Sequence, residues 1–165
     1  PMWIRYEKRD VLCGLVIYAA GDTVATLILG TFDPFRMLGM MIVGATVYAY
    51  EIPNYCKRIE ICSDQVCGRF RSALSKTGLA LLYFNPLWIA RHLLFIQIFS
   101  GNWSDVSVSI LMTALISWLV NIPLSITGNA VIQLAIPLKW RFLGSAVFSG
   151  LLAVYYALSG VWFAQ

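Results

Sequence analysis

The sequence has very little charge, and its charged residues are unevenly placed. Asp, Glu, Lys and Arg make up only 12% of the 165 residues, whereas soluble domains contain about 25%. Residues 11–30 contain no acidic or basic residue except Asp22, and residues 106–137 contain none. A soluble fold of this size cannot bury that much apolar surface, so we expect lipid rather than water around most of the chain.

Groups that bind metals or carry out catalysis are also scarce. The single histidine, His92, offers only one haem or metal ligand. Cys56, Cys62 and Cys67 are separated by five and four residues, unlike a zinc ribbon or a redox pair. We see no nucleophile with a neighbouring base, no phosphate-binding loop and no acidic pair. We therefore expect no enzyme and no cofactor, and the composition is compatible with bound phospholipid.

The long apolar runs that are present predict an all-α, polytopic membrane protein. A helix rises about 1.5 Å per residue, so about 20 apolar residues cross a hydrocarbon core of about 30 Å. We expect one membrane domain over residues 1–165. The fourth run should kink near residues 123–128, at two positions, Asn121-Ile122-Pro123 and Thr127-Gly128-Asn129. A similar interruption is expected at Asn85-Pro86. The five predicted spans are residues 11–31, 37–52, 77–99, 106–135 and 142–163.

The positions of the basic residues predict the orientation. Ten of the twelve Lys and Arg residues precede the first span or lie in the loops 53–76 and 136–141. With five spans these regions face the same compartment, which the positive-inside rule makes the matrix or the cytoplasm. The N-terminus is expected there, and the C-terminus on the opposite side.

Between the second and third spans, residues 54–76 have the pattern of an amphipathic helix. Apolar residues such as Tyr55, Ile59 and Phe70 recur every three or four positions. We expect the helix to lie on anionic lipid, or alternatively to contact another membrane subunit. Because the basic residues lie beside spans, nucleic acid is not an expected partner. The basic residues expected to face lipid or a partner are Lys57, Arg58, Arg69, Arg71 and Lys76.

A few polar residues lie inside the predicted spans, where charge is rare and usually functional. Asp22 lies about 15 Å into the first span, and Arg91 is close enough to the same depth that the two could pair. Such residues either line a polar path or hold helices together by ion pairs and hydrogen bonds. The candidate cluster consists of Asp22, Asn85, Arg91, His92 and Asn121.

Several short motifs occur in order along most of the chain. They are Gly21-Asp22, Asp33 followed by Arg36 and Gly44, Pro86 followed by Gly101, Ile136-Pro137-Leu138-Lys139-Trp140-Arg141, and Leu158-Ser159. This set resembles the Mpv-seventeen and peroxisomal-membrane-protein-twenty-two family, small helical proteins of mitochondrial and peroxisomal membranes. The resemblance implies a channel-like protein, and we expect the mitochondrial inner membrane as its location.

A second set of motifs gives an alternative. Asp22-Thr23, Phe84-Asn85-Pro86 and Gly101-Asn102-Trp103 resemble small bacterial L-alanine exporters, which implies the bacterial inner membrane. Two functions therefore remain open. The first is a small-solute channel or transporter whose path the polar cluster lines. The second is a non-catalytic accessory subunit of a larger respiratory or ATP synthase-type membrane complex.

Overall fold

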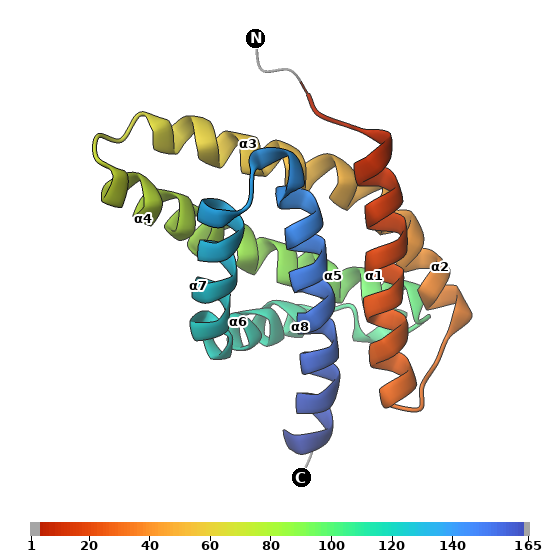
Figure 1. Ribbon diagram of the computed structural model, residues 1–165. Helices are drawn as coiled ribbons and strands as arrows, with labels where there is room; N and C mark the ends of the chain where they lie inside the picture. Colours follow the sequence, from red (N-terminus) through yellow and green to blue (C-terminus); the bar gives the residue numbers. More distant parts are fainter. Residues whose placement is uncertain (1–3, 164–165) are drawn as a thin grey trace. The chain divides into compact units, whose positions relative to one another are not determined.

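The chain is helical, as the sequence predicts. The computed structural model describes the backbone of residues 4–163, and their side chains except those of residues 105, 153 and 155–163. Within these residues there is no strand (Figure 1). These residues form two compact units. The first contains Pro1–Pro53 with Phe142–Gln165, and the second contains Asn54–Arg141.

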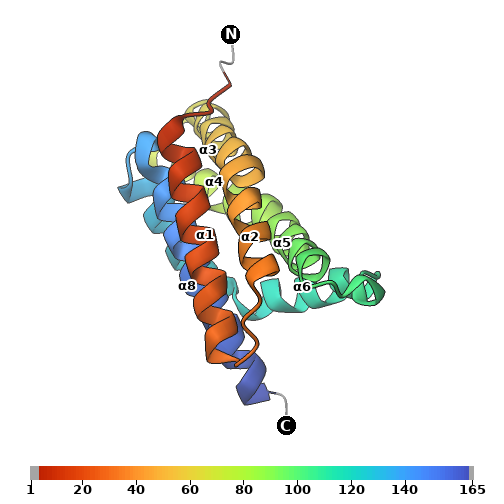
Figure 2. The same ribbon diagram turned by 90° about the vertical axis from the view of Figure 1, so that its right-hand side faces the viewer.

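In the first unit, α1 packs against α2 and the π-helical segment η1 that follows it (Figures 1 and 2). The turn between α1 and α2 ends at Asp33, whose carboxylate accepts a hydrogen bond of 2.8 Å from the Phe35 amide and so caps α2. Pro34 then opens the helix, where its missing amide proton costs nothing. The elements are α1 (Lys8–Ile28), α2 (Pro34–Val43), η1 (Gly44–Tyr48), the first residues of α3 (Ala49–Asp64), and α8 (Arg141–Phe163).

Glycines allow the helices of this unit to approach closely. A Cβ atom placed on Gly14 would lie 2.0 Å from the Gly44 carbonyl oxygen, and one on Gly44 would lie 2.2 Å from the Gly14 carbonyl oxygen. At Gly21 a Cβ atom would lie 2.8 Å from the Cα atom of Gly150 on α8. Close backbone contacts of this kind are typical of helices in membranes. Lipid is as apolar as a leucine side chain there, so close packing rather than burial from water brings helices together.

The second unit begins with a helical hairpin. The elements after α3 are α4 (Arg69–Leu79), the π-helical η2 (Ala80–Phe84), α5 (Asn85–Phe99), the short turn η3 (Trp103–Asp105), α6 (Ser109–Val120), α7 (Ile122–Ala130), the π-helical η4 (Val131–Ala135) and the turn η5 (Leu138–Trp140). In Figure 1, α3 and α4 run beside each other. Tyr55 donates a hydrogen bond of 3.0 Å to the Leu79 carbonyl, and the hydroxyls of Ser63 and Ser75 are 3.2 Å apart.

The hairpin corrects the single amphipathic helix expected over residues 54–76. The first helix ends at Asp64 and the second begins at Arg69. Gly68 adopts a φ of 95°, a conformation that other residues rarely take, and this reverses the chain. The apolar repeat is real, but its two halves differ, since Ile59 of the first half is buried whereas Phe70 and Leu74 of the second half are exposed.

Pro86 does not interrupt the third predicted span. The helix runs without a break over Arg69–Phe99, 31 residues. The π-helical segment η2 lies immediately before Asn85, and its wider turn accommodates the proline ring and the missing amide proton. Part of the altered hydrogen bonding is satisfied from outside, because the Trp118 indole donates a bond of 2.9 Å to the Leu81 carbonyl.

The fourth apolar run bends at the first of its two expected positions. Helices α6 and α7 meet at Asn121 with an angle of 69°, two residues before Pro123. Beyond it, α7 passes Gly128 without a break and continues into η4.

Two or three of the described helices can cross a membrane. Lys8–Ile28 and Arg69–Phe99 are each long and apolar enough. Ser109–Val120 and Ile122–Ala135 meet the same requirement together, as a broken span or as a re-entrant loop.

Candidate functional site

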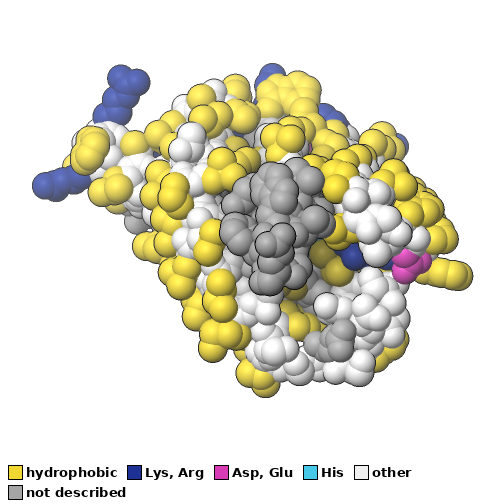
Figure 3. Space-filling view, turned by 90° about the horizontal axis from the view of Figure 1, so that it is seen from below, with side chains coloured by type: hydrophobic (Ala, Val, Ile, Leu, Met, Phe, Trp, Pro, Cys, Tyr) yellow, Lys and Arg dark blue, Asp and Glu magenta, His cyan; other side chains and the backbone are white. Residues whose placement is uncertain are grey.

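Many large apolar side chains are exposed, and a set of polar and charged side chains is buried beside the apolar core. Large hydrophobic residues such as Phe35, Phe70 and Val108 are exposed, and apolar side chains cover much of the face shown in Figure 3. This distribution suits lipid as the surrounding solvent. The buried polar and charged residues are Asp10, Asp22, Thr26, Ser63, Asn121, Ser125, Asn129, Gln133, Arg141 and Ser149.

Four of these residues form one line that starts at the bend before α7 and continues along α7 and η4. Asn121, Ser125, Asn129 and Gln133 are spaced by four residues, and all four are buried. We call them the polar line. Residues four apart share one face of a helix, and the π-helical bonding of η4 helps to keep Gln133 on that face. Twelve residues at about 1.5 Å each extend over about 18 Å.

The side chains of the polar line present amide and hydroxyl groups, not charges. The amide nitrogens of Asn121 and Asn129 donate hydrogen bonds of 2.8 Å to the carbonyls four residues before them, those of Ser117 and Ser125. The first bond ties the Asn121 amide to α6 across the bend, and the second fixes the Asn129 amide along α7. The line can therefore offer oriented neutral dipoles to a small polar solute.

A charged cluster continues the line. The Gln133 amide oxygen accepts a hydrogen bond of 3.3 Å from Arg141 Nη1, which also donates to the Glu60 carboxylate. Lys76 Nζ lies 2.7 Å from the other Glu60 oxygen. We call Glu60, Lys76 and Arg141 the charge cluster.

Arg141 is the most firmly held member of the cluster. Its side chain is only 7% exposed, and its Nε donates a bond of 3.1 Å to the Ile136 carbonyl. Arg141 is also the first residue of α8, where the helix dipole disfavours a cation. The Glu60 carboxylate offsets both the burial and the dipole, which explains why the two side chains pair.

The charge cluster predicts a specific dependence of stability on pH. Burial raises the pKa of Glu60, but hydrogen bonds from Lys76 and then Arg141 outweigh it, and the pKa falls below its usual 4.5. A lowered pKa stabilises the folded state above pH 4.5, and this contribution disappears as the pH falls through the folded-state value. Glu60→Gln should therefore cost about 1–3 kcal/mol at neutral pH, and less in acid. Thermal unfolding in detergent across a pH series tests this, and a constant difference would contradict it.

Asp22 pairs with Arg36, a residue between the first two predicted spans. Asp22 lies on α1 with 3% of its surface exposed. Its Oδ2 accepts a bond of 2.9 Å from Arg36 Nε, and its Oδ1 accepts one of 2.5 Å from Arg36 Nη2, near the start of α2. This bidentate geometry is the strongest that Arg and a carboxylate form. The suggested pair of Asp22 with Arg91 would join the two units and stays a prediction.

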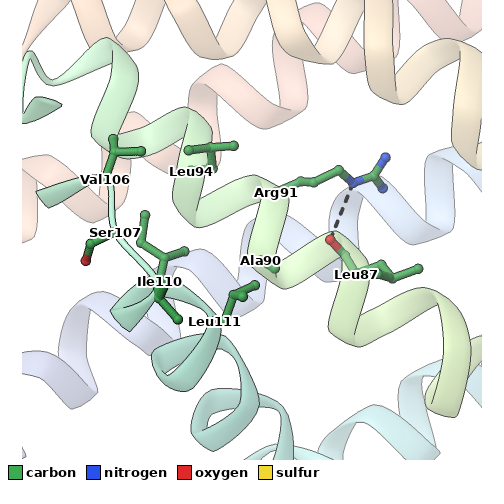
Figure 4. Close-up of a pocket in the computed structure, with 9 residues that line it drawn as sticks. Leu87, Ala90, Arg91, Leu94, Val106, Ser107, Ile110 and Leu111 are labelled. Carbon is green, nitrogen blue, oxygen red and sulfur yellow. Dashed lines mark hydrogen bonds between the residues drawn. The ribbon is translucent and has the colours of Figure 1, made fainter.

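The other predicted residues lie on separate elements. Asn85, Arg91 and His92 lie on α5 and are partly buried, and Asn121 lies at the bend before α7. The His92 ring stacks on Trp88 with ring centres 4.7 Å apart. Arg91 Nε donates a bond of 3.4 Å to the Leu87 carbonyl of its own helix (Figure 4). Of the five, Asn121 belongs to the polar line.

Arg91 also borders a pocket between α5 and α6. The pocket has a volume of about 470 Å³ and is lined mainly by apolar residues such as Leu94, Ile110 and Leu111. In Figure 4 the Arg91 guanidinium points away from Val106 and Ile110. The pocket therefore offers apolar contacts, which suits an acyl chain better than a polar solute.

The expected basic face is only partly exposed. Arg58, Arg69 and Arg71 are exposed, and Lys57 is half-buried. Lys76 instead points to Glu60, with 12% of its side chain exposed. Phe70, between two of the arginines, is 79% exposed. A basic tip with an exposed aromatic ring suits the interface of an anionic membrane.

Sequence reasoning missed Ser125, Asn129, Gln133, Glu60 and Arg141 as members of a site. A signal for three of them was present, since Asn121 begins a polar repeat of four residues in an otherwise apolar run. In the described part of the chain, no three His, Cys, Asp or Glu side chains are placed to hold a metal ion. No protein-family model matches the chain, and neither a curated protein nor a solved structure is significantly similar to it.

Proposed function

We propose that the protein is a small-solute channel or transporter of the Mpv-seventeen-like type, and that the polar line forms part of the solute path. The observation that carries this proposal is the burial of four polar side chains along one face of an apolar helix. The line covers about 18 Å, more than half of a hydrocarbon core of about 30 Å. Polar groups at that depth are unfavourable unless they serve packing or a solute.

The arrangement of the helix that carries the line also favours a path. Broken or bent helices with polar groups near the middle of the membrane are the usual way for transporters to build a solute site. Here the bend of 69° at Asn121 lies at the start of the line. The three π-helical segments add local departures from regular helix, which occur often at functional sites.

We further propose the topology of the protein in its membrane. It has five spans, with α6 and α7 together forming the fourth. The basic loops and the N-terminus face the matrix if the membrane is the mitochondrial inner membrane, or the cytoplasm if it is the bacterial one. The charge cluster then lies at the basic side, and the polar line extends from it into the membrane.

Flux through reconstituted vesicles tests the proposal. Wild-type protein in liposomes should release labelled glycerol, acetate or choline faster than empty liposomes do. Asn129→Leu should lower the rate of the transported solute about tenfold, equivalent to about 1.4 kcal/mol on the barrier. Leucine keeps the size of the side chain but removes the amide dipole.

Val131→Leu is the matched control, because Val131 lies on the same helix but is exposed. Its flux should equal that of the wild type. Equal flux in Asn129→Leu and wild type would remove the polar line from the path. A folded wild-type protein that releases no solute and migrates on native gels within a large assembly would favour the accessory subunit instead.

A further inference from the structure

The charge cluster carries more positive than negative charge. Lys76 and Arg141 share the single carboxylate of Glu60. The nearest other acid paired with the cluster is Asp64, 3.7 Å from Lys76 but 66% exposed, so water screens most of its charge. The side chains of the polar line are all neutral. The end of the polar line therefore has a net positive potential.

The three charged side chains are not equally fixed. Arg141 is held by the Ile136 carbonyl and the Gln133 amide as well as by Glu60. Glu60 is more exposed, at 26%, and its carboxylate binds the two cations. A rotation about the side-chain bonds of Glu60 would move the carboxylate out while the guanidinium stays in place.

A cost opposes that movement unless another anion arrives. A buried cation that loses its only carboxylate destabilises the folded state. The Glu60 carboxylate can therefore leave Arg141 and Lys76 when another anion takes its place, but not when the two cations would stay without an anion. A small anion with one or two oxygens could accept the same hydrogen bonds from Arg141 and Lys76.

We propose that Arg141 and Lys76 form an anion site at the basic end of the polar line, and that Glu60 occupies it as a tethered anion which a small monovalent solute anion displaces. This inference rests on the proposed function and specifies its substrate class. Anions exchange with the carboxylate and reach Gln133, while cations are repelled by the two basic groups. Neutral solutes gain nothing from the exchange.

Two measurements on the purified full chain test the inference. The first is release of labelled acetate, choline and glycerol from liposomes. Wild-type protein should release acetate at least several-fold faster than choline. In Glu60→Gln the tethered anion is missing, so half-maximal acetate flux should occur at several-fold lower acetate concentration.

The second measurement does not depend on transport. Acetate should raise the unfolding temperature of detergent-solubilised Glu60→Gln more than that of the wild type, because the neutral side chain leaves the site open. Lys76→Gln should reduce the acetate effect in either background. Asp64→Asn removes a nearby but exposed carboxylate and is the matched control, expected to behave as the wild type.

The outcomes separate the two proposals. Equal release of choline and acetate by the wild type would overturn the anion site and leave the channel standing. Absence of any flux, with the acetate effect on stability present, would overturn the channel and leave the anion site standing. An unfolding temperature of Glu60→Gln that does not respond to acetate would overturn the anion site, whatever the flux.

Discussion

Gly14→Ala is expected to prevent the first unit from forming. The new methyl group would lie 2.0 Å from the Gly44 carbonyl oxygen and 2.6 Å from its carbon. Overpacking usually costs about 1–3 kcal/mol because side chains can move aside. Here both partners are helix backbones, which cannot move independently, so we expect a cost above about 3 kcal/mol. α1 would have to separate from η1, and the Tyr18–Tyr48 ring contact beside them would be lost.

Gly78→Ala is the matched control for this substitution. Gly78 lies on α4, and a Cβ atom there would meet nothing within 4 Å. Alanine favours helix over glycine by about 1 kcal/mol, so this variant should be as stable as the wild type or more so. Size-exclusion profiles and thermal unfolding in detergent measure both. A Gly14→Ala protein that is monodisperse with an unchanged unfolding temperature would contradict the close packing of α1 and η1.

Asp22→Ala is expected to have the second largest effect. It removes the carboxylate that binds Arg36 through both oxygens and leaves the guanidinium with its charge uncompensated. Breaking a buried pair from one side typically costs 3–5 kcal/mol. The double variant Asp22→Ala/Arg36→Met should recover much of the loss, because no unpaired charge remains. Chemical or thermal unfolding of the two variants measures the difference.

Asp33→Ala supplies the comparison for Asp22. Asp33 is a nearby acid that caps α2 by accepting a hydrogen bond from the Phe35 amide. Loss of such a cap costs about 1 kcal/mol. If Asp22→Ala and Asp33→Ala were equally mild, the Asp22–Arg36 pair would be a surface ion pair and not a buried one. Failure of the double variant to regain stability would show that Asp22 acts through contacts other than Arg36.

The helices were predictable from the sequence, but the turns and bends between them were less predictable. Apolar length located α1, α8 and the run containing α5, because burial in lipid requires that length. Residues 54–76 were misread as one helix because their apolar repeat continues across Gly68. Periodicity does not record that this glycine adopts a positive φ. Pro86 was expected to break a helix. A π-helical turn before it instead accommodates the proline within a continuous helix. No sequence pattern predicts such a turn.

The site was predicted less well, for a related reason. Asp22 was identified by its depth, yet its partner was sought on another span, because Arg36 follows a turn and looks like a loop residue. Long side chains reach across several ångströms, so sequence position alone does not identify a partner. Arg141 and Glu60 are 81 residues apart, and only the folded chain brings them together. The Asn121 repeat was visible but was read as a place for a kink.

The π-helical segment between α2 and α3 accommodates one additional residue in the chain. A π-helical turn holds one residue more than an α-helical turn, so deletion of one residue from Gly44–Tyr48 would restore regular i→i+4 bonding. The residues that follow would keep their present faces, because the π-helical turn already absorbs the additional residue. Ile52, which is buried just after the segment, would stay buried. Homologous chains should therefore be able to lose one residue here, whereas a deletion within the regular turns of α1 would rotate the residues after it by about 100° about the helix axis.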